Sequence, residues 1–147
     1  MGDIDVFRIV EGCRNLERKM NMALTYSGLK IAQYRALIII EESEEATVSL
    51  LARRLGITRA TASVMVNELT AAGVVEAKSN PVDRRSFYVR LTHGGIDRMR
   101  IAKLHVSLVQ KKLFEALGPE AINGLISFLE TVESGGSKGG GGGPDVG

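Results

Sequence analysis

Residues 47–71 carry two short amphipathic patterns separated by one tight turn, and this spacing leaves few folds open to the chain. Thr47 is a good N-cap residue ahead of the first pattern. Gly56 follows the pattern at once, where helices commonly end on a residue in the left-handed conformation. Apolar residues recur between these limits at the i, i+3, i+4, i+7 spacing of one helix face, namely Val48, Leu51, Ala52 and Leu55. The pattern predicts a short helix with a sharp end.

A second helix is predicted directly after this turn, because Thr58 is again a good N-cap residue. Its buried face repeats the same spacing, with Ala62, Met65, Val66 and Leu69. Two helices joined in this way form a helix-turn-helix, whose second helix typically enters the major groove of duplex DNA.

The opposite face of the second helix is small and hydrogen-bonding, and it has no acidic residue before Glu68. Asn67 could pair with an adenine edge and Val64 could touch a thymine methyl, whereas Ser, Thr and Arg suit phosphates or bases. An ordinary surface helix, the alternative interpretation, would usually carry more Glu and Lys. The sequence predicts contact with double-stranded DNA through Arg59, Ala60, Thr61, Ser63, Val64 and Asn67.

A basic β-hairpin is predicted after Gly73, which ends the second helix. Its strands are 74–78 and 87–91, and the loop SNPVDRRS between them has turn chemistry. Arg84 and Arg85 lie near the tip beside Asp83, and adjacent arginines on a protruding loop suit a narrow, electronegative minor groove. Alone, the loop would be read as a solvated turn with a surface Asp–Arg pair. Directly after a helix-turn-helix, it predicts a DNA-contacting wing.

Charge is segregated along the chain in a way that supports a polyanionic partner. Nine basic and four acidic residues lie between Leu51 and Arg100, so this segment is +5 while the chain is +2. The remainder is therefore net negative. A basic region within a nearly neutral protein indicates that one surface meets a polyanion.

These residues resemble the multiple-antibiotic-resistance regulator (MarR) family of bacterial transcription factors. The matching pieces are LARRLGIT, VNELTAAGVVEA, NPVDRRSFYVRLT and Gly95, and the flanking helices match in order over about residues 3–133. The resemblance implies a homodimer on a palindromic operator, usually a repressor relieved by a small ligand or an oxidant. It also implies that Arg85 is a minor-groove arginine oriented by Asp83. Two residues depart from the pattern: Val64, where many relatives carry a basic or polar residue, and Lys30, which replaces a Ser/Thr cap.

The rest of the chain reads as helix, so the predicted fold is mainly α with a small β-wing. A single domain is expected over residues 1–134, followed by a flexible glycine-rich tail, 135–147. The DNA-binding head spans about 31–92, and dimerisation helices span about 3–25 and 92–133. These outer helices carry more apolar residues than one small head can cover, which favours a shared homodimer core over a self-contained monomer of six helices.

No enzymatic constellation is visible, and we expect neither catalytic residues, nor a metal, nor a cofactor. The two histidines, His93 and His105, lie on different turns of one predicted helix, without metal-ligand spacing. The tail glycines follow no strand and lack a Gly-Lys-Ser/Thr ending, which excludes a phosphate-binding loop. No stretch is long enough to span a membrane, the N-terminus is too charged for a signal peptide, and a lone cysteine is compatible with the cytoplasm, where we expect the protein.

Control of the protein is expected through a small organic effector rather than through oxidation. Cys13 lies on the apolar stripe of the first helix, where burial would leave its thiol inert. An effector is expected where the first and fifth helices meet the head, near Arg18, Met20 and Tyr26, although Tyr26 is better explained by plain packing. The sequence thus predicts a dimeric, DNA-binding repressor relieved by a ligand. The alternatives are a winged-helix module that binds protein only, a small-molecule enzyme, and a redox regulator acting through Cys13.

Overall fold

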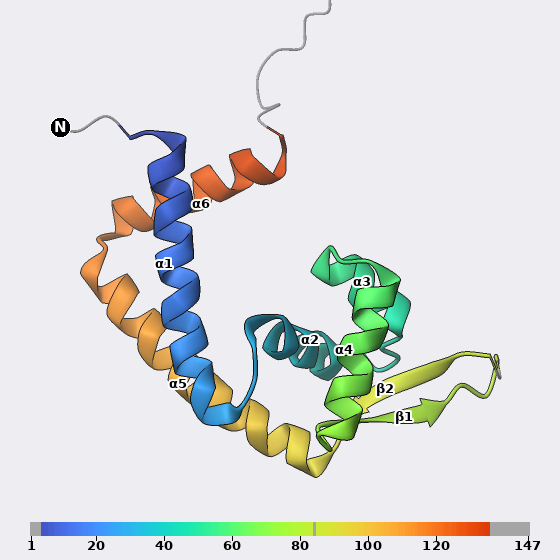
Figure 1. Cartoon of the computed structure of the whole chain (residues 1–147). Helices are drawn as coiled ribbons and strands as arrows, with labels where there is room; N and C mark the ends of the chain where they lie inside the picture. The colour runs from blue at the N-terminus through green and yellow to red at the C-terminus, as the bar shows by residue number, and fades with distance from the viewer. Residues whose placement is uncertain (1–3, 84, 136–147) are drawn as a thin grey trace, which may run out of the picture. The chain divides into compact units, whose positions relative to one another are not determined.

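The computed structural model describes residues 4–83 and 85–135, and it is mainly helical with one small antiparallel sheet (Figure 1). The predicted fold class is confirmed. Its contacts divide the chain into two compact units, residues 1–109 and 110–147. The elements in chain order are α1 (Val6–Leu24), the 3-10 turn η1 (Thr25–Ser27), α2 (Ile31–Glu42), α3 (Val48–Leu55), α4 (Arg59–Ala71), β1 (Val75–Ser79), β2 (Phe87–Leu91), α5 (His93–Ala116) and α6 (Pro119–Glu133).

The helices of the first unit begin at polar caps that satisfy otherwise unpaired backbone N–H groups. The hydroxyl of Thr47 accepts from the Leu50 N–H at 3.1 Å, and that of Thr92 accepts from the Gly95 N–H at 3.0 Å. Lys30 precedes α2 without a side-chain oxygen to offer. Gln33 compensates, because its Oε1 accepts from the Lys30 N–H at 3.0 Å. The unusual residue at position 30 therefore leaves the start of α2 intact.

The core of the first unit forms around α2, as its continuous apolar run predicts. Ala36 and Leu37 are fully buried. The same hydrophobic cluster also takes side chains from the end of α1, from loops, from α3, α4 and the two strands, and from the start of α5, including Leu24, Leu51, Val66, Leu69, Val75, Val89 and Met99. The face of α4 predicted to be buried is indeed the inward one, with Met65 half-buried at its edge.

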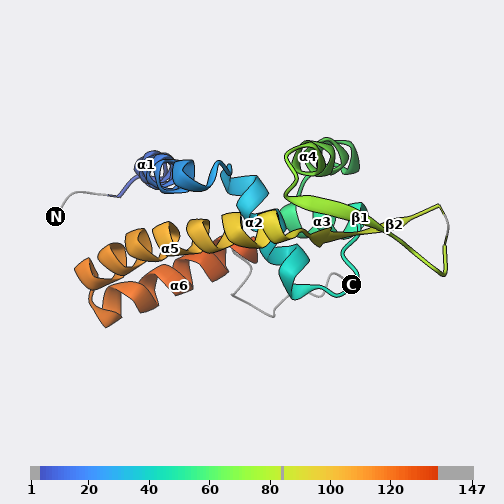
Figure 2. The same cartoon turned by 90° about the horizontal axis from the view of Figure 1, so that it is seen from below.

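The wing is an antiparallel hairpin in which Val75 pairs with Leu91 and Ser79 pairs with Phe87. It projects away from α2, α3 and α4 (Figure 2). Its second strand matches the prediction, and its first is shifted by one residue, beginning at Val75 and ending at Ser79, because Val74 belongs to the turn that closes α4. An isolated bridge also joins Ala46 to β2, where the Val89 N–H donates to the Ala46 carbonyl at 2.8 Å. This bridge, absent from the sequence prediction, attaches the wing to the loop before α3.

The junction between the wing and α5 is tightly packed backbone against backbone. A Cβ added at Gly95 would lie 2.0 Å from the carbonyl oxygen of Val74. The Thr92 hydroxyl donates to the carbonyl of Gly73, close to the same place. Gly95 is therefore required by the close approach of α5 to the end of α4, and this junction holds the start of α5 to the head.

Large apolar side chains remain exposed on α1, on the outer part of α5 and on α6. On α1 the exposed fraction of Phe7 is 73%, and on α5 that of Leu104 is 60%. None of the residues of α6 is buried. Cys13 is also exposed, so the prediction that this thiol is buried is wrong for the single chain, because the buried residues of α1, Ala23 and Leu24, lie at its far end. In the described part of the chain, every helix is too short or too polar to cross a membrane.

Candidate nucleic-acid interface

The α3–α4 turn is closed by backbone geometry that only certain residues allow. Gly56 has a φ of 67° in the left-handed region, which favours glycine. The Ile57 N–H donates to the Ala52 carbonyl at 3.0 Å, and the Gly56 N–H donates to the Arg53 carbonyl at 3.3 Å. These paired bonds form a Schellman motif, which ends α3 sharply. The turn thereby sets the direction in which α4 leaves.

α4 presents the predicted DNA-facing residues on its solvent side. Its N-cap, Thr58, accepts from the Thr61 N–H at 3.1 Å, and the two threonine hydroxyls lie 2.8 Å apart. Five of the predicted contact residues are exposed and Ser63 is half-buried; the exposed ones are Arg59, Ala60, Thr61, Val64 and Asn67. Ala62, Val66 and Leu69 face inward instead. A single helix therefore separates a packing face from a polar face free to approach another molecule.

The wing tip is organised by hydrogen bonds centred on Asn80, a residue that the sequence prediction used only as a turn former. Its Oδ1 accepts from the Val82 N–H at 2.9 Å and from the Asp83 N–H at 3.4 Å. Its Nδ2 donates to the Ser86 hydroxyl at 2.9 Å, across the loop. The amide group of Asn80 thus joins the two arms of the loop. Its signal in the sequence is the Asn-Pro pair, which favours a turn.

Asp83 and Arg85 contact each other through the backbone at this tip. The Asp83 Oδ1 accepts from the Arg85 N–H at 3.0 Å, and both residues are exposed. Asp83 therefore orients the main chain at Arg85, whose guanidinium forms no ion pair with another described residue. Arg84 lies outside the described residues.

Ion pairs sort the basic residues of the head into two groups. Arg90 pairs with Glu76 across the hairpin at 2.5 Å, and Arg54 lies 3.5 Å from Glu42. Arg100 pairs with Asp97. Among the described residues of the same segment, the cations without an ion pair are Arg53, Arg59, Lys78, Arg85 and Arg98. Four of these five lie on α3, α4 or the wing. The charge count from sequence could not show that Arg90 is paired, because its partner Glu76 is distant along the chain.

Tyr88 connects the wing to the loop before α3. Partial desolvation raises the pKa of its phenol, and the charge and hydrogen bond of the Glu45 carboxylate raise the pKa further. Glu45 precedes Ala46, whose carbonyl already accepts from β2. Glu45, in the loop before α3, therefore helps to hold the wing strand.

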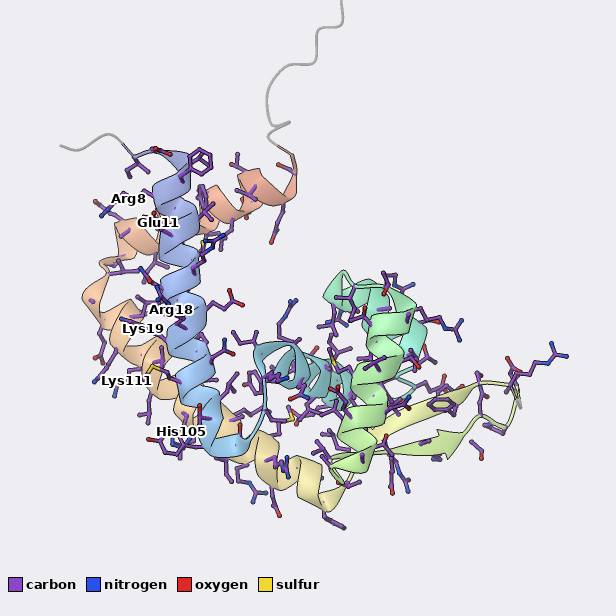
Figure 3. The ribbon with its side chains drawn as sticks, in the orientation of Figure 1. Arg8, Glu11, Arg18, Lys19, His105 and Lys111 are labelled. Carbon is purple, nitrogen blue, oxygen red and sulfur yellow. The ribbon has the colours of Figure 1, made fainter. Side chains whose placement is uncertain are left out.

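The three residues predicted to bind an effector lie on α1 and in η1. Arg18 is exposed on α1 (Figure 3) and donates to the Asn15 side chain. Met20 is half-buried. Tyr26 is 73% exposed, and its ring stacks on that of His105 with centroids 4.4 Å apart. A hollow of about 550 Å³ lies between the end of α1 and the start of α2, lined by Glu17, Asn21, Thr25, Leu29, Lys30, Ile31 and Ala32.

Metal-ion chemistry finds no support in the described part of the chain, where no group of three or more His, Cys, Asp or Glu side chains could hold a metal ion. The polar groups that do gather are the hydroxyl, amide and guanidinium groups of α4 and the wing. Such groups suit hydrogen bonds to phosphates and base edges.

Comparison with known proteins agrees with this geometry. Residues 27–86, which include α2, α3, α4 and most of the wing, match the sequence model of the MarR family. The structure is similar to Sco3205 of Streptomyces coelicolor, a MarR-family transcriptional regulator solved in complex with DNA. The identity is 29%, the TM-score is 0.79, and the match covers 88% of this chain and 84% of that one.

Two further structures extend the likeness over nearly the whole chain. AbsC of Streptomyces coelicolor, a MarR-family transcriptional regulator, is 25% identical with a TM-score of 0.79, covering 92% of this chain and 97% of that one. CouR of Rhodococcus jostii, solved with p-coumaroyl-CoA, is 21% identical with a TM-score of 0.74, covering 94% and 96%; this likeness is one of fold. The head, residues 27–86, thus matches the MarR family in sequence, and the winged helix-turn-helix fold of the chain is similar to those of MarR-family transcriptional regulators.

Proposed function

We propose that this protein is a DNA-binding transcriptional regulator that reads duplex DNA with α4 in the major groove and Arg85 in the minor groove. The observation that carries the proposal is the common exposure of the polar face of α4 and of an arginine on the wing tip without an ion partner among the described residues. The family match over residues 27–86 and the DNA complex of the similar protein Sco3205 support it. A winged helix that binds only protein would show no steep salt dependence of duplex binding.

The regulator is proposed to act as a homodimer on a palindromic operator, and as a repressor. Exposed apolar side chains on α1, α5 and α6 support dimerisation, because a second copy would remove them from water. Two heads would then address half-sites about one helical turn, roughly 34 Å, apart. A dimer bound over such a site excludes other proteins from it, which is the simplest route to repression.

Relief of repression is proposed to come from a small organic ligand near α1, η1 and α5. Arg18, Met20 and Tyr26 remain the proposed contacts, and the hollow beside Lys30 offers a second place of suitable size. The CouR structure holds an acyl-CoA in a protein of this fold, which makes a ligand-responsive regulator a reasonable model. A ligand can shift DNA affinity only by as much as its own affinity differs between the two states.

The test is duplex binding by wild type and Arg85→Ala over a range of salt concentrations. Counterion release makes the affinity of a phosphate-contacting protein fall steeply with salt. Arg85→Ala should bind more weakly and reduce the salt slope by about one unit, while its circular dichroism stays unchanged because the side chain fills no core. Arg90→Ala is the matched control, since Glu76 already neutralises Arg90. Salt-independent binding, or no binding to any duplex, would refute the proposal.

Oxidation of Cys13 is a second candidate for control, and the exposure of this thiol favours it. Accessible thiols are the ones that oxidants and disulfide partners reach. If peroxide releases the wild type from DNA but leaves Cys13→Ser bound, the redox mechanism holds. If both proteins stay bound and both respond to the same organic ligand, the ligand mechanism holds.

A further inference from the structure

Val64 is an apolar side chain that the fold does not use. Its exposed fraction is 57%, although it lies in the middle of a well-formed helix. Val66 on the same helix is 4% exposed and belongs to the core. Packing therefore explains Val66 and leaves Val64 without a structural purpose.

Helix stability does not explain Val64 either. A β-branched side chain loses rotamer freedom in a helix, so valine is a poorer helix former than alanine at an exposed position. The same restriction has a use in recognition, because it holds the two methyl groups in one direction without further loss of entropy on binding. Val64 is thus a stiff apolar probe on a polar surface.

The neighbours of Val64 define what such a probe could touch. Ala60, one turn earlier, is exposed and too small to obstruct an approaching surface. Asn67, three residues later, is exposed on the same side, with an amide that can pair bidentately with adenine. In the major groove, the apolar group on a base edge is the C5-methyl of thymine.

We propose that Val64 is a specificity-determining residue that reads the 5-methyl group of a thymine, next to an adenine read by Asn67. The inference rests on the DNA-binding function proposed above and deepens it by naming the class of site. Side chains three apart on a helix are about 5–6 Å from one another at Cβ, a distance between one and two times the ~3.4 Å spacing of stacked base pairs. The two residues therefore address the same or neighbouring A·T pairs.

The experiment begins with the duplex that the full chain selects from a random pool. Each thymine of one half-site is then replaced singly by deoxyuridine, which lacks only the methyl group, and affinity is measured by fluorescence anisotropy at constant salt. One thymine per half-site should lose about four-fold in affinity, the equivalent of one buried methyl group at ~0.8 kcal/mol. Replacing the same T·A pair by 5-methylcytosine·G should bind better than replacing it by C·G.

Val64→Ala supplies the decisive comparison, because it shortens the probe without opening a core cavity. It should bind the thymine duplex several-fold more weakly and should no longer distinguish thymine from deoxyuridine at that position. Val82→Ala is the matched control: Val82 is 92% exposed on the wing, away from α4, and its loss should leave the ratio unchanged. Circular dichroism of each variant reports the helix content.

Two results would overturn the proposal in distinguishable ways. If wild type and Val64→Ala lose the same factor at every deoxyuridine, Val64 does not read the methyl group, although the protein still binds DNA. If the wild type selects no duplex at all, the DNA-binding function fails and this inference fails with it.

Discussion

Single residues set the geometry at two points of the head, Gly95 and Asn80. Gly95 permits contact between the start of α5 and the carbonyl of Val74, where no side chain fits. Asn80 ties the wing loop together through both ends of its amide. Gly95 acts by leaving room for backbone atoms, and Asn80 acts through its hydrogen bonds. Substitution of Gly95 should therefore change mainly stability, and substitution of Asn80 mainly DNA affinity.

Gly95→Ala should destabilise the protein by about 1–3 kcal/mol, because the added Cβ must push backbone atoms apart. Urea unfolding followed by circular dichroism measures the change. Gly12→Ala is the control: that glycine is helical and has no atom within 4 Å of an added Cβ, so alanine should stabilise α1 slightly. Equal stability of wild type and Gly95→Ala would contradict this prediction, because it would mean that the backbone at the junction can shift at little cost.

Asn80→Ala should reduce DNA affinity a few-fold with little effect on thermal stability, because it frees a loop tip that is not part of the core. Hydrogen exchange at the Val82 and Asp83 amides should accelerate, since both donate to Asn80. Ser86→Ala removes only the bond across the loop and should have a smaller effect. Unchanged affinity in Asn80→Ala would mean that the wing needs no preorganisation.

Among the helices of the head, α4 and α2 differ in how far they are buried and therefore in what stabilises them. α4 is a half-exposed helix whose first turn carries three of its six predicted DNA contacts, so its N-cap matters to function as well as to stability. α2 is largely buried, and its polar Tyr34 lies against the core near Lys103 and Glu41, which form an ion pair between α5 and α2 at 2.7 Å.

Thr58→Ala should cost about 1 kcal/mol of stability, the usual effect of removing an N-cap hydroxyl. Because the fraying turn holds Arg59, Ala60 and Thr61, DNA affinity should also fall. Thr58→Ser keeps the oxygen that accepts from the Thr61 N–H and should restore both properties. Urea unfolding and anisotropy provide the two measurements; a Ser variant as weak as the Ala variant would argue against the cap.

Tyr34 should make the protein less stable in strongly basic solution. Burial raises the pKa of its phenol, Lys103 lowers it and Glu41 raises it, with a net rise above the ordinary value of 10.0. Above pH 10.0 the unfolded chain therefore ionises first, and the free energy of unfolding falls with rising pH. Tyr34→Phe should show a shallower fall between pH 9 and pH 11 in urea titrations. Parallel curves for the two proteins would contradict this.

The whole molecule leaves apolar surface on α1, α5 and α6 that a second copy is proposed to cover. Leu104 and Leu108 are 60% and 55% exposed on α5. The proposed dimer makes the assembly, rather than the single chain, the unit that reads a palindrome. Dimerisation would also determine how accessible the Cys13 thiol is in solution.

Sedimentation at micromolar concentration should give about twice the chain mass of 15.8 kDa. Leu104→Glu together with Leu108→Glu should shift the protein toward the monomer, because charged groups resist burial in an apolar interface. Val82→Glu adds a charge to an exposed apolar position of the wing and should leave the dimer intact. A wild type that sediments only as a monomer would end the dimer proposal.

Local structure could be predicted from the sequence because its determinants are local. Thr47, Thr58 and Thr92 cap helices through bonds within three residues, and Gly56 ends α3 through its own backbone conformation. The helical spacing of apolar positions likewise predicted which face of α4 is buried. These features need no knowledge of distant parts of the chain, and the turn-forming residues between two short strands indicated the wing in the same way.

The tertiary structure alone decided what depends on contacts between distant residues. Arg90 is neutralised by Glu76, and the backbone of Ala46 bonds to β2. Cys13 is exposed, although it lies on an apolar stripe whose last residues, Ala23 and Leu24, are buried. Periodicity shows that a face is apolar, but burial also requires a partner surface. The position of that partner is a property of the folded chain or of its assembly, and it cannot be read from neighbours in sequence.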